Sequence, residues 1–182
     1  IAETLGKYKG VAVLIDPVMV STSGCRLMQE DALQVFRTEL MPLASLLTPN
    51  VPEAEILSGI KIETVDDMDR AANKICNEAG CAVLVKGGHL DGNTKTDILY
   101  ADGQRTAIYE AQTVSTRNTH GTGCTLSSAI TAHLALGHTM ADAIRLAKTY
   151  LYKALEAGKD VEIGRGHGPV NHFFNPHPYY TK

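Results

Sequence analysis

The sequence is poor in aromatic residues and has no large excess of either charge. It contains no tryptophan, and aromatic residues make up only 5% of its 182 residues. The formal net charge is −3, which indicates no basic surface for nucleic acid or for a membrane. No window approaches the roughly 20 apolar residues that a membrane span needs. The first ten residues also lack the apolar region of a signal peptide, so we expect a cytoplasmic protein.

Several common signatures of binding sites are also missing. The chain has four cysteines but no CxxC pair, which is typical of free thiols rather than of disulfides. It has no GxxxxGK[ST] motif, and no GxGxxG follows a predicted strand. A P-loop fold and a dinucleotide-binding fold are therefore not supported.

The composition that is present is that of an ordinary globular domain. Hydrophobic residues make up 44% and charged residues 20% of the chain, which provides enough apolar material for a core. No repeat, linker or change in composition divides the sequence, so we predict one domain over 1–182. The chain begins at Ile1 in what resembles the end of a helix, and we therefore expect an N-terminal part of this domain to be absent.

Hydrophobic periodicity predicts strands that alternate with helices. Apolar runs typical of buried parallel strands cover 10–15, 44–48 and 81–85. Start and stop signals predict helices over 31–43, 52–58, 64–79, 121–136 and 139–158. Two further runs, 96–100 and 105–109, flank Asp102-Gly103, a strong hairpin signal. We assign 21–24 to a loop and no element to the tail, 163–182.

This order of elements predicts an α/β fold with a mostly parallel sheet, helices on both faces and an antiparallel edge hairpin. Ligands of such sheets gather at the carboxyl ends of the strands. Asp16, Asn50 and Lys86 each follow one of the predicted parallel strands. Each alone could be a turn residue, but together they predict a polar site at this edge. Lys86 could bind phosphate oxygens there, or it could extend into solvent.

A glycine-rich turn leads into the helix predicted over 121–136. Gly121 and Gly123 allow close approach of the backbone to a ligand, and the N–H groups of a first helical turn point at it. This arrangement suits a phosphate or a phosphoryl group in transfer. The alternative is a plain helix start capped by Thr119 or Thr122.

Two residues of the predicted helices could take part in chemistry. Cys124 lies in the first turn, where the helix dipole favours a thiolate that could accept a proton from a hydroxyl group. The alternative for Cys124 is a small buried hydrophobic residue. Lys148 lies among apolar residues of the last helix, where it could also simply extend its charge into solvent.

Asn50 and Glu53 stand three residues apart across Pro52. An amide and a carboxylate at the start of a helix can hold water molecules on Mg²⁺, which prefers oxygen ligands and keeps much of its water. The alternative is that Asn50 caps the helix while Glu53 interacts with its dipole. Both interpretations can hold together.

The motifs together resemble the hydroxymethylpyrimidine/phosphomethylpyrimidine kinases of thiamine synthesis, which belong to the ribokinase-like superfamily. The resemblance covers nearly the whole chain, in order and with compatible spacing. Cys124, where most sugar kinases of the superfamily carry aspartate, and the Gly-His-Gly-Pro-Val-Asn-His tail are its more specific features. The segments that carry it are Asp16–Val20, Thr48–Glu55, Val85–His89, Asn118–Ser128 and Gly166–His172.

The resemblance implies a ribokinase-like three-layer sandwich and a kinase that uses ATP and Mg²⁺. It implies phosphorylation of 4-amino-5-hydroxymethyl-2-methylpyrimidine, then of its monophosphate to the diphosphate, by a homodimer. Gly121, Thr122 and Gly123 would form the anion hole, and Cys124 would be the catalytic base. Asn50 and Glu53 would belong to the magnesium-water site. The nucleotide-side residues would be Asp16, Val18, Lys86, Thr119 and Lys148.

One departure from the family is large. Judged from typical domain proportions, roughly the first third of a family chain has no counterpart in this sequence. That part carries the first strands and most pyrimidine contacts, so the substrate pocket cannot be assigned. A pyridoxal kinase of the same superfamily and a truncated, inactive core are therefore alternatives, as is a binding module without catalytic activity.

Overall fold

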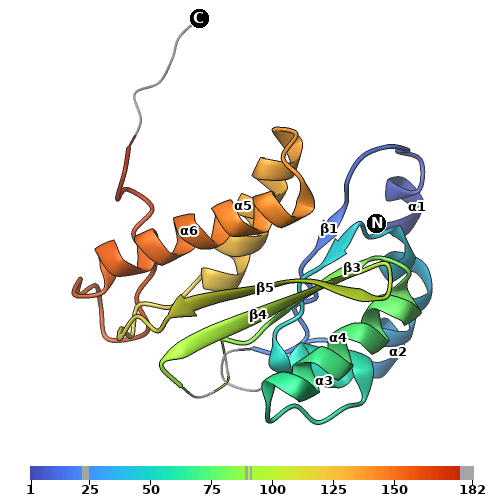
Figure 1. Cartoon of the computed structure of the whole chain (residues 1–182), viewed down its shortest axis with the longest axis horizontal. Helices are drawn as coiled ribbons and strands as arrows, with labels where there is room; N and C mark the ends of the chain where they lie inside the picture. The colour runs from blue at the N-terminus through green and yellow to red at the C-terminus, as the bar shows by residue number, and fades with distance from the viewer. Residues whose placement is uncertain (22–24, 89, 91, 177–182) are drawn as a thin grey trace, which may run out of the picture. The chain divides into compact units, whose positions relative to one another are not determined.

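The computed structural model describes residues 1–21, 25–88, 90 and 92–176, which form two compact units (Figure 1). The first unit is Ile1–Gln112 and the second is Thr113–Lys182. Most of the loop predicted at 21–24, His89 of one family segment and the tail beyond 176 lie outside the described residues.

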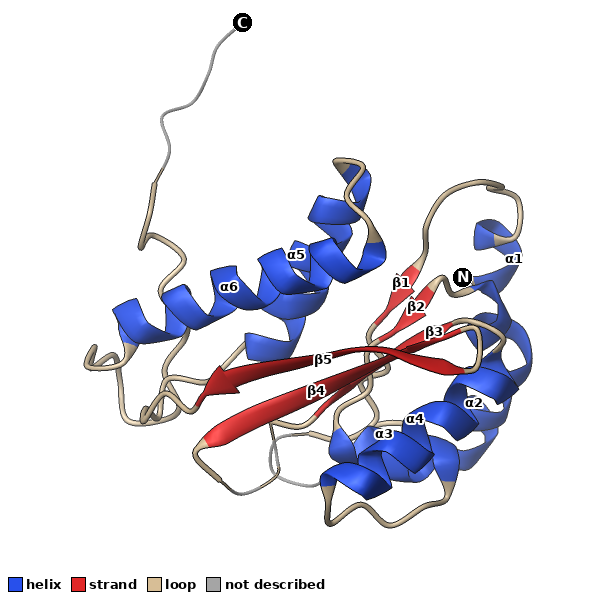
Figure 2. Cartoon of the chain, viewed as in Figure 1, coloured by secondary structure: helices blue, strands red, loops and turns tan. Residues whose placement is uncertain are grey.

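The first unit is built on a mixed five-stranded sheet in the order β1-β2-β3-β4-β5 (Figure 2). The first three strands pair in parallel, and the last two add an antiparallel hairpin. This confirms the predicted α/β class and its edge hairpin. The strands are β1 (Leu14–Ile15), β2 (Leu46–Leu47), β3 (Ala82–Lys86), β4 (Thr94–Ala101) and β5 (Gln104–Gln112).

The first two strands are much shorter than the apolar runs that predicted them. Gly10 adopts φ 77°, a left-handed conformation that turns the chain before β1. A 3₁₀ turn, Met41–Leu43, directly precedes the approach to β2. The apolar runs therefore report burial correctly, while only two residues of each run pair as a strand.

The hairpin between β4 and β5 closes through Asp102 and Gly103, as predicted. Their φ angles of 53° and 70° are both left-handed, which is the requirement of the tight turn that matches strand twist. Asp69 accepts hydrogen bonds from the Tyr100 hydroxyl (2.7 Å) and from Arg105 (3.1 Å), so one carboxylate joins both strands to a helix.

The helices of this unit begin and end where the sequence signals them. α3 (Val51–Ser58) and α4 (Val65–Ala79) both start in capping boxes and stop at glycines with positive φ, Gly59 and Gly80. The helix predicted over 31–43 is continuous but changes type, from α2 (Glu30–Val35) through a π turn (Phe36–Leu40) to the 3₁₀ turn. A short helix, α1 (Ala2–Leu5), precedes β1.

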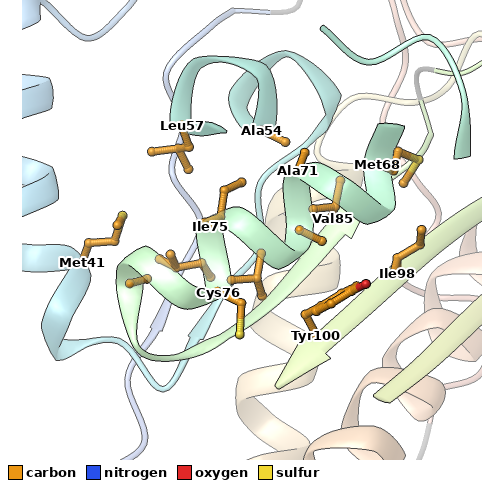
Figure 3. Close-up of a cluster of buried hydrophobic side chains, with 14 of the residues drawn as sticks. Met41, Ala54, Leu57, Met68, Ala71, Ile75, Cys76, Val85, Ile98 and Tyr100 are labelled. Atoms are coloured by element: carbon orange, nitrogen blue, oxygen red, sulfur yellow. The ribbon is translucent and has the colours of Figure 1, made fainter. Parts of the chain in front are cut away.

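The core of the first unit lies where α3 and α4 pack on the sheet (Figure 3). Met68, Ala71 and Ile75 of α4 are almost fully buried against Val85 and Ile98 of the sheet. Burial of each large aliphatic side chain stabilises the fold by about 1.5–3 kcal/mol. This packing holds the carboxyl end of β3 and the start of α3 in place.

The second unit contains two packed helices, α5 (Thr122–Ala135) and α6 (Met140–Gly158). Their bounds match the predicted ones to within a residue, and Gly137 with φ 87° lies in the connection between them. The tail returns along α6: the Asn171 N–H donates to the Ala154 carbonyl (3.1 Å), and Val170 is buried. Within the described residues, none of the helices is both long and apolar enough to cross a membrane.

The contact between β3 and β4 gives a prediction about stability. A Cβ atom on Gly87 would lie 2.0 Å from the Thr96 carbonyl oxygen, so Gly87→Ala should lower the free energy of unfolding by at least about 2 kcal/mol. The matched control is Gly88→Ala, because a Cβ there meets nothing within 4 Å. Urea titration followed by circular dichroism measures both. Equal stability of the two variants would contradict the packing at Gly87.

Candidate active site

Polar side chains meet at the carboxyl ends of the three parallel strands of the first unit. The Lys86 Nζ donates to Asp16 Oδ1 at 2.8 Å, and the Thr48 hydroxyl donates to the same oxygen at 2.9 Å. The side chains of Lys86 and Asp16 are only 13% and 15% exposed, so this ion pair has lost most of its water. The structure therefore brings Asp16 and Lys86 together, as strand-end reasoning predicted.

Asn50 and Glu53 form the capping box that starts α3. Asn50 Oδ1 accepts the Glu53 N–H (3.0 Å), and Glu53 Oε2 accepts the Asn50 N–H (2.8 Å). The second oxygen, Glu53 Oε1, accepts the Met19 N–H at 3.4 Å. The capping interpretation of both residues is thus confirmed, and a role in holding magnesium stays a prediction.

The capping box places a carboxylate of unusual character next to the ion pair. Glu53 is 2% exposed, and this burial raises the pKa of its carboxyl group above the ordinary value. The Asn50 N–H and the charge of Lys86 act in the opposite direction, while the negative charge of Asp16 adds to the rise in pKa. Asp16, Lys86 and Glu53 therefore form one electrostatically connected group.

The donor set can be tested against Mg²⁺. In the described ranges, no three His, Cys, Asp or Glu residues form a group that could hold a metal ion, so a closed protein cage is not built there. Asp16, Asn50 and Glu53 supply oxygens, the ligand type that Mg²⁺ prefers, and Mg²⁺ usually keeps several waters. The residues fit an ion held through its water shell.

Two neighbours of this group were not predicted from the sequence. Thr48 is fully buried and donates to Asp16, and its place at the end of a predicted strand was a usable signal. Met19 contributes through its backbone N–H, which no side-chain pattern can indicate. Val18, predicted to lie near the nucleotide, is 51% exposed, and its N–H donates to the Asp16 carbonyl (2.9 Å).

The second unit carries the glycine turn at the start of α5. Gly121 is the N-cap, with φ 82° and no side-chain capping bond, so the alternative of a helix start capped by a threonine is wrong. The first bond into the helix runs from the Thr125 N–H to the Gly121 carbonyl (2.8 Å). The N–H groups of Gly123 and Cys124 precede it and point out of the helix start, where an anion can bind.

The remaining predicted residues of this unit lie near the turn in sequence or on α6. Cys124 is exposed, so the alternative of a buried hydrophobic residue is wrong. Thr119 accepts the Thr122 N–H (3.3 Å) through its carbonyl and thereby tightens the turn. Lys148 lies in the middle of α6 with its side chain half-buried. The nucleotide roles of Thr119 and Lys148 stay predictions.

Comparison with known proteins supports the class of enzyme that this fold and these residues indicate. A pyridoxal kinase of Bacillus subtilis, solved with ADP, superposes with a TM-score of 0.84 at 36% identity, over 94% of this chain and 64% of that one. A phosphomethylpyrimidine kinase of Clostridium difficile gives 0.71 at 42% identity, over 85% of this chain and 62% of that one. The fold is therefore that of the ribokinase-like small-molecule kinases.

The family follows from the sequence matches. The family model described as phosphomethylpyrimidine kinase matches residues 1–171. A hydroxymethylpyrimidine/phosphomethylpyrimidine kinase of Rhizobium meliloti is 45% identical over 174 residues, which are 95% of this chain and 65% of that protein. A thiamine biosynthetic bifunctional enzyme of Arabidopsis thaliana is 44% identical over 94% of this chain and 33% of that enzyme. The chain belongs to the phosphomethylpyrimidine kinase family and spans about two thirds or one third of these relatives.

The buried carboxyl group of Glu53 predicts a pH dependence of stability. Because its pKa is raised in the folded state, the folded protein binds more protons than the unfolded one just above the ordinary value of 4.5. The contribution of Glu53 to stability should therefore fall as pH rises through 4.5, by at most about 1.4 kcal/mol per pH unit. The measurement is the difference in unfolding free energy between the wild type and Glu53→Gln from pH 4 to 7.

Glu55 on the same helix provides a control of opposite sign. Burial acts to raise its pKa, but the Ile62 N–H and Lys61 outweigh burial, so that the pKa is lowered. The difference between the wild type and Glu55→Gln should therefore grow as pH rises from the folded-state pKa toward 4.5 and then stay constant. A slope of the same sign for both variants would contradict the electrostatics described for Glu53.

Proposed function

We propose that the chain is a kinase domain that transfers the γ-phosphoryl group of ATP to 4-amino-5-hydroxymethyl-2-methylpyrimidine, and then to its monophosphate, in thiamine biosynthesis. The main support for this proposal is the buried Lys86–Asp16 ion pair beside Glu53. It lies at the strand ends of a chain that belongs to this kinase family. A site that places charges at this edge is suited to a charged ligand. The two units would act as one ribokinase-like domain.

The proposed nucleotide contacts follow from charge and from the glycine turn. Lys86 would bind triphosphate oxygens as a point charge, with Asp16, Val18, Thr119 and Lys148 on the nucleotide side. A pyridoxal kinase of Staphylococcus aureus, 31% identical and with a TM-score of 0.82, was solved in complex with AMP-PCP, which supports nucleotide binding by this fold. Mg²⁺ would be held through water by Asp16, Asn50 and Glu53, and it would offset the triphosphate charge.

The chemical step would rest on position and electrostatics. The N–H groups of Gly123 and Cys124 would stabilise charge on the equatorial oxygens of the phosphoryl group as it moves in line from ATP to the acceptor. In the first phosphorylation, Cys124 would accept the proton that the substrate hydroxyl group loses as the new O–P bond forms. In the second, the acceptor is an ionised phosphate, which needs no base.

This difference between the two steps predicts an asymmetric effect of Cys124→Ala. The variant should lower kcat of the first phosphorylation by about 100-fold and kcat of the second by less than about threefold. The two steps are measured separately, with the alcohol and with its monophosphate as substrates. Cys25→Ala, which removes another exposed cysteine, is the control and should leave both steps unchanged. Equal losses in both steps would exclude the base role of Cys124.

A pyridoxal kinase is the second candidate function. Solved pyridoxal kinases of two species superpose with TM-scores of 0.84 and 0.82 at identities above 30%, so the same fold serves both ring alcohols. The test offers hydroxymethylpyrimidine and pyridoxal together with ATP and Mg²⁺ and identifies the products by mass spectrometry.

Each outcome of this competition is decisive. We expect pyrimidine monophosphate and diphosphate as the main products. Pyridoxal phosphate alone would support the second candidate, and no product would favour a binding module or an inactive core.

We further propose a homodimeric, cytoplasmic enzyme whose ligands are small molecules, without nucleic-acid or membrane partners.

A further inference from the structure

We infer that Asn118 is a positioning residue, held by the tail segment 167–171, that fixes the geometry of the turn from Gly121 to Cys124. This segment, here called the strap, belongs to a motif that the proposed chemistry does not use. The inference rests on the proposed function only for its meaning in catalysis. All the residues and contacts involved lie within the second unit.

Asn118 is tied to the end of α6 by its side chain. It is 3% exposed, and its Nδ2 donates to the carbonyls of Gly158 and Val161, both at 2.7 Å. Its own N–H donates to the Thr116 hydroxyl oxygen (3.0 Å), and that hydroxyl group donates to the Lys159 carbonyl (3.0 Å). Hydrogen bonds thus hold the residues that precede the turn against the C-terminal end of α6.

The strap closes over Asn118 from the other side. A Cβ atom on Gly168 would lie 2.1 Å from Asn118 Oδ1 and 2.8 Å from its Cγ, so only glycine allows this approach. The Gly168 carbonyl accepts the His120 N–H at 3.0 Å, and His120 and Pro169 form a parallel bridge. His167 Nδ1 lies 3.2 Å from the Arg117 carbonyl oxygen.

The strap is itself held against α6, so its contacts fix the position of the residues that lead into the turn. Asn171 donates its N–H to the Ala154 carbonyl, and a Cβ on Gly158 would lie 3.2 Å from Asn171 Cβ. Strap contacts therefore fix the chain at Arg117, Asn118 and His120. The next residue after His120 is Gly121, the N-cap of α5.

Position matters here because the proposed anion site consists of backbone N–H groups. Such groups cannot adapt by changing a side-chain rotamer, and an error of about 1 Å in a catalytic group can cost about 100-fold in rate. The contacts of the strap and of α6 that hold Asn118 are here called the clamp. The clamp therefore determines whether the Gly123 and Cys124 N–H groups meet the charge that develops in transfer.

Gly168→Ala tests the clamp directly, with Gly166→Ala as the matched control. Gly166 directly precedes the strap, and a Cβ there meets nothing within 4 Å. In the full-length protein, Gly168→Ala should lower kcat by about 100-fold, with KM for ATP changed by less than about threefold, because the lost interaction acts in the transition state. Gly166→Ala should leave both constants unchanged. The folded fraction, measured by circular dichroism at the assay temperature, corrects kcat.

A double variant separates positioning from general damage. The methyl group that Gly168→Ala introduces would stand 3.5 Å from the Asn118 Cβ, an ordinary contact, so adding Asn118→Ala removes the clash. The double variant should have the same kcat as Asn118→Ala alone. Losses that multiply would overturn the inference, as would a loss of kcat in Gly168→Ala that equals its loss of folded protein.

A third readout does not depend on the substrate. Cys124 is exposed and lies in the turn, so its rate of alkylation by iodoacetamide, followed by peptide mass spectrometry, reports the geometry of the turn. Gly168→Ala should change this rate by at least about threefold, since thiol reactivity depends on its surroundings, while the rate at Cys25 stays constant. If the wild type shows no kinase activity, the proposed function fails and this readout still decides the inference. An unchanged Cys124 rate would overturn it.

Discussion

The dehydrated ion pair between Lys86 and Asp16 is the constraint on which the site of the first unit depends. Such a pair adds little net stability, because the cost of removing water from two charges offsets their attraction. Removing Asp16 would nevertheless take away the carboxylate that offsets the buried charge of Lys86, at a cost of about 3–5 kcal/mol. The pair therefore fixes two charges at the ends of β1 and β3 more than it strengthens the sheet. Glu53, buried beside them, makes this edge a place where charge is held at a cost, which is typical of functional sites.

Much of this fold could be predicted from local signals, and the exceptions have a physical reason. Asp102-Gly103 specifies its turn because both residues must adopt positive φ, and the helices α3 and α4 stop at the glycines that permit a left-handed cap. The first two strands were predicted too long. Apolar runs report that residues are buried, whereas strand length depends on where a partner lies alongside. That information is not local.

The site residues, like the fold, could be predicted where a local sequence signal indicates their position. Asp16 directly follows β1 and Lys86 ends β3, so the carboxyl ends of parallel strands place both at one edge of the sheet. For Asn50 and Glu53, the sequence could not separate a helix cap from a magnesium site, because the same oxygens in the same positions serve both purposes. Met19 could not have been found, since it contributes only its backbone N–H to Glu53.

The two groups of site residues also need different kinds of support, which explains why the strap escaped local analysis. A lysine can follow its ligand by changing rotamers, so burial against one carboxylate is enough to keep it in reach. Backbone N–H groups have no such freedom, and their position must be set by the chain that leads to them. At the glycine turn this is done by contacts between residues about fifty positions apart, such as Asn118 with Gly168. The decisive feature there is an atom that is absent, the Cβ of Gly168, and a glycine in a tail without periodicity gives no local sign of what its missing side chain makes room for.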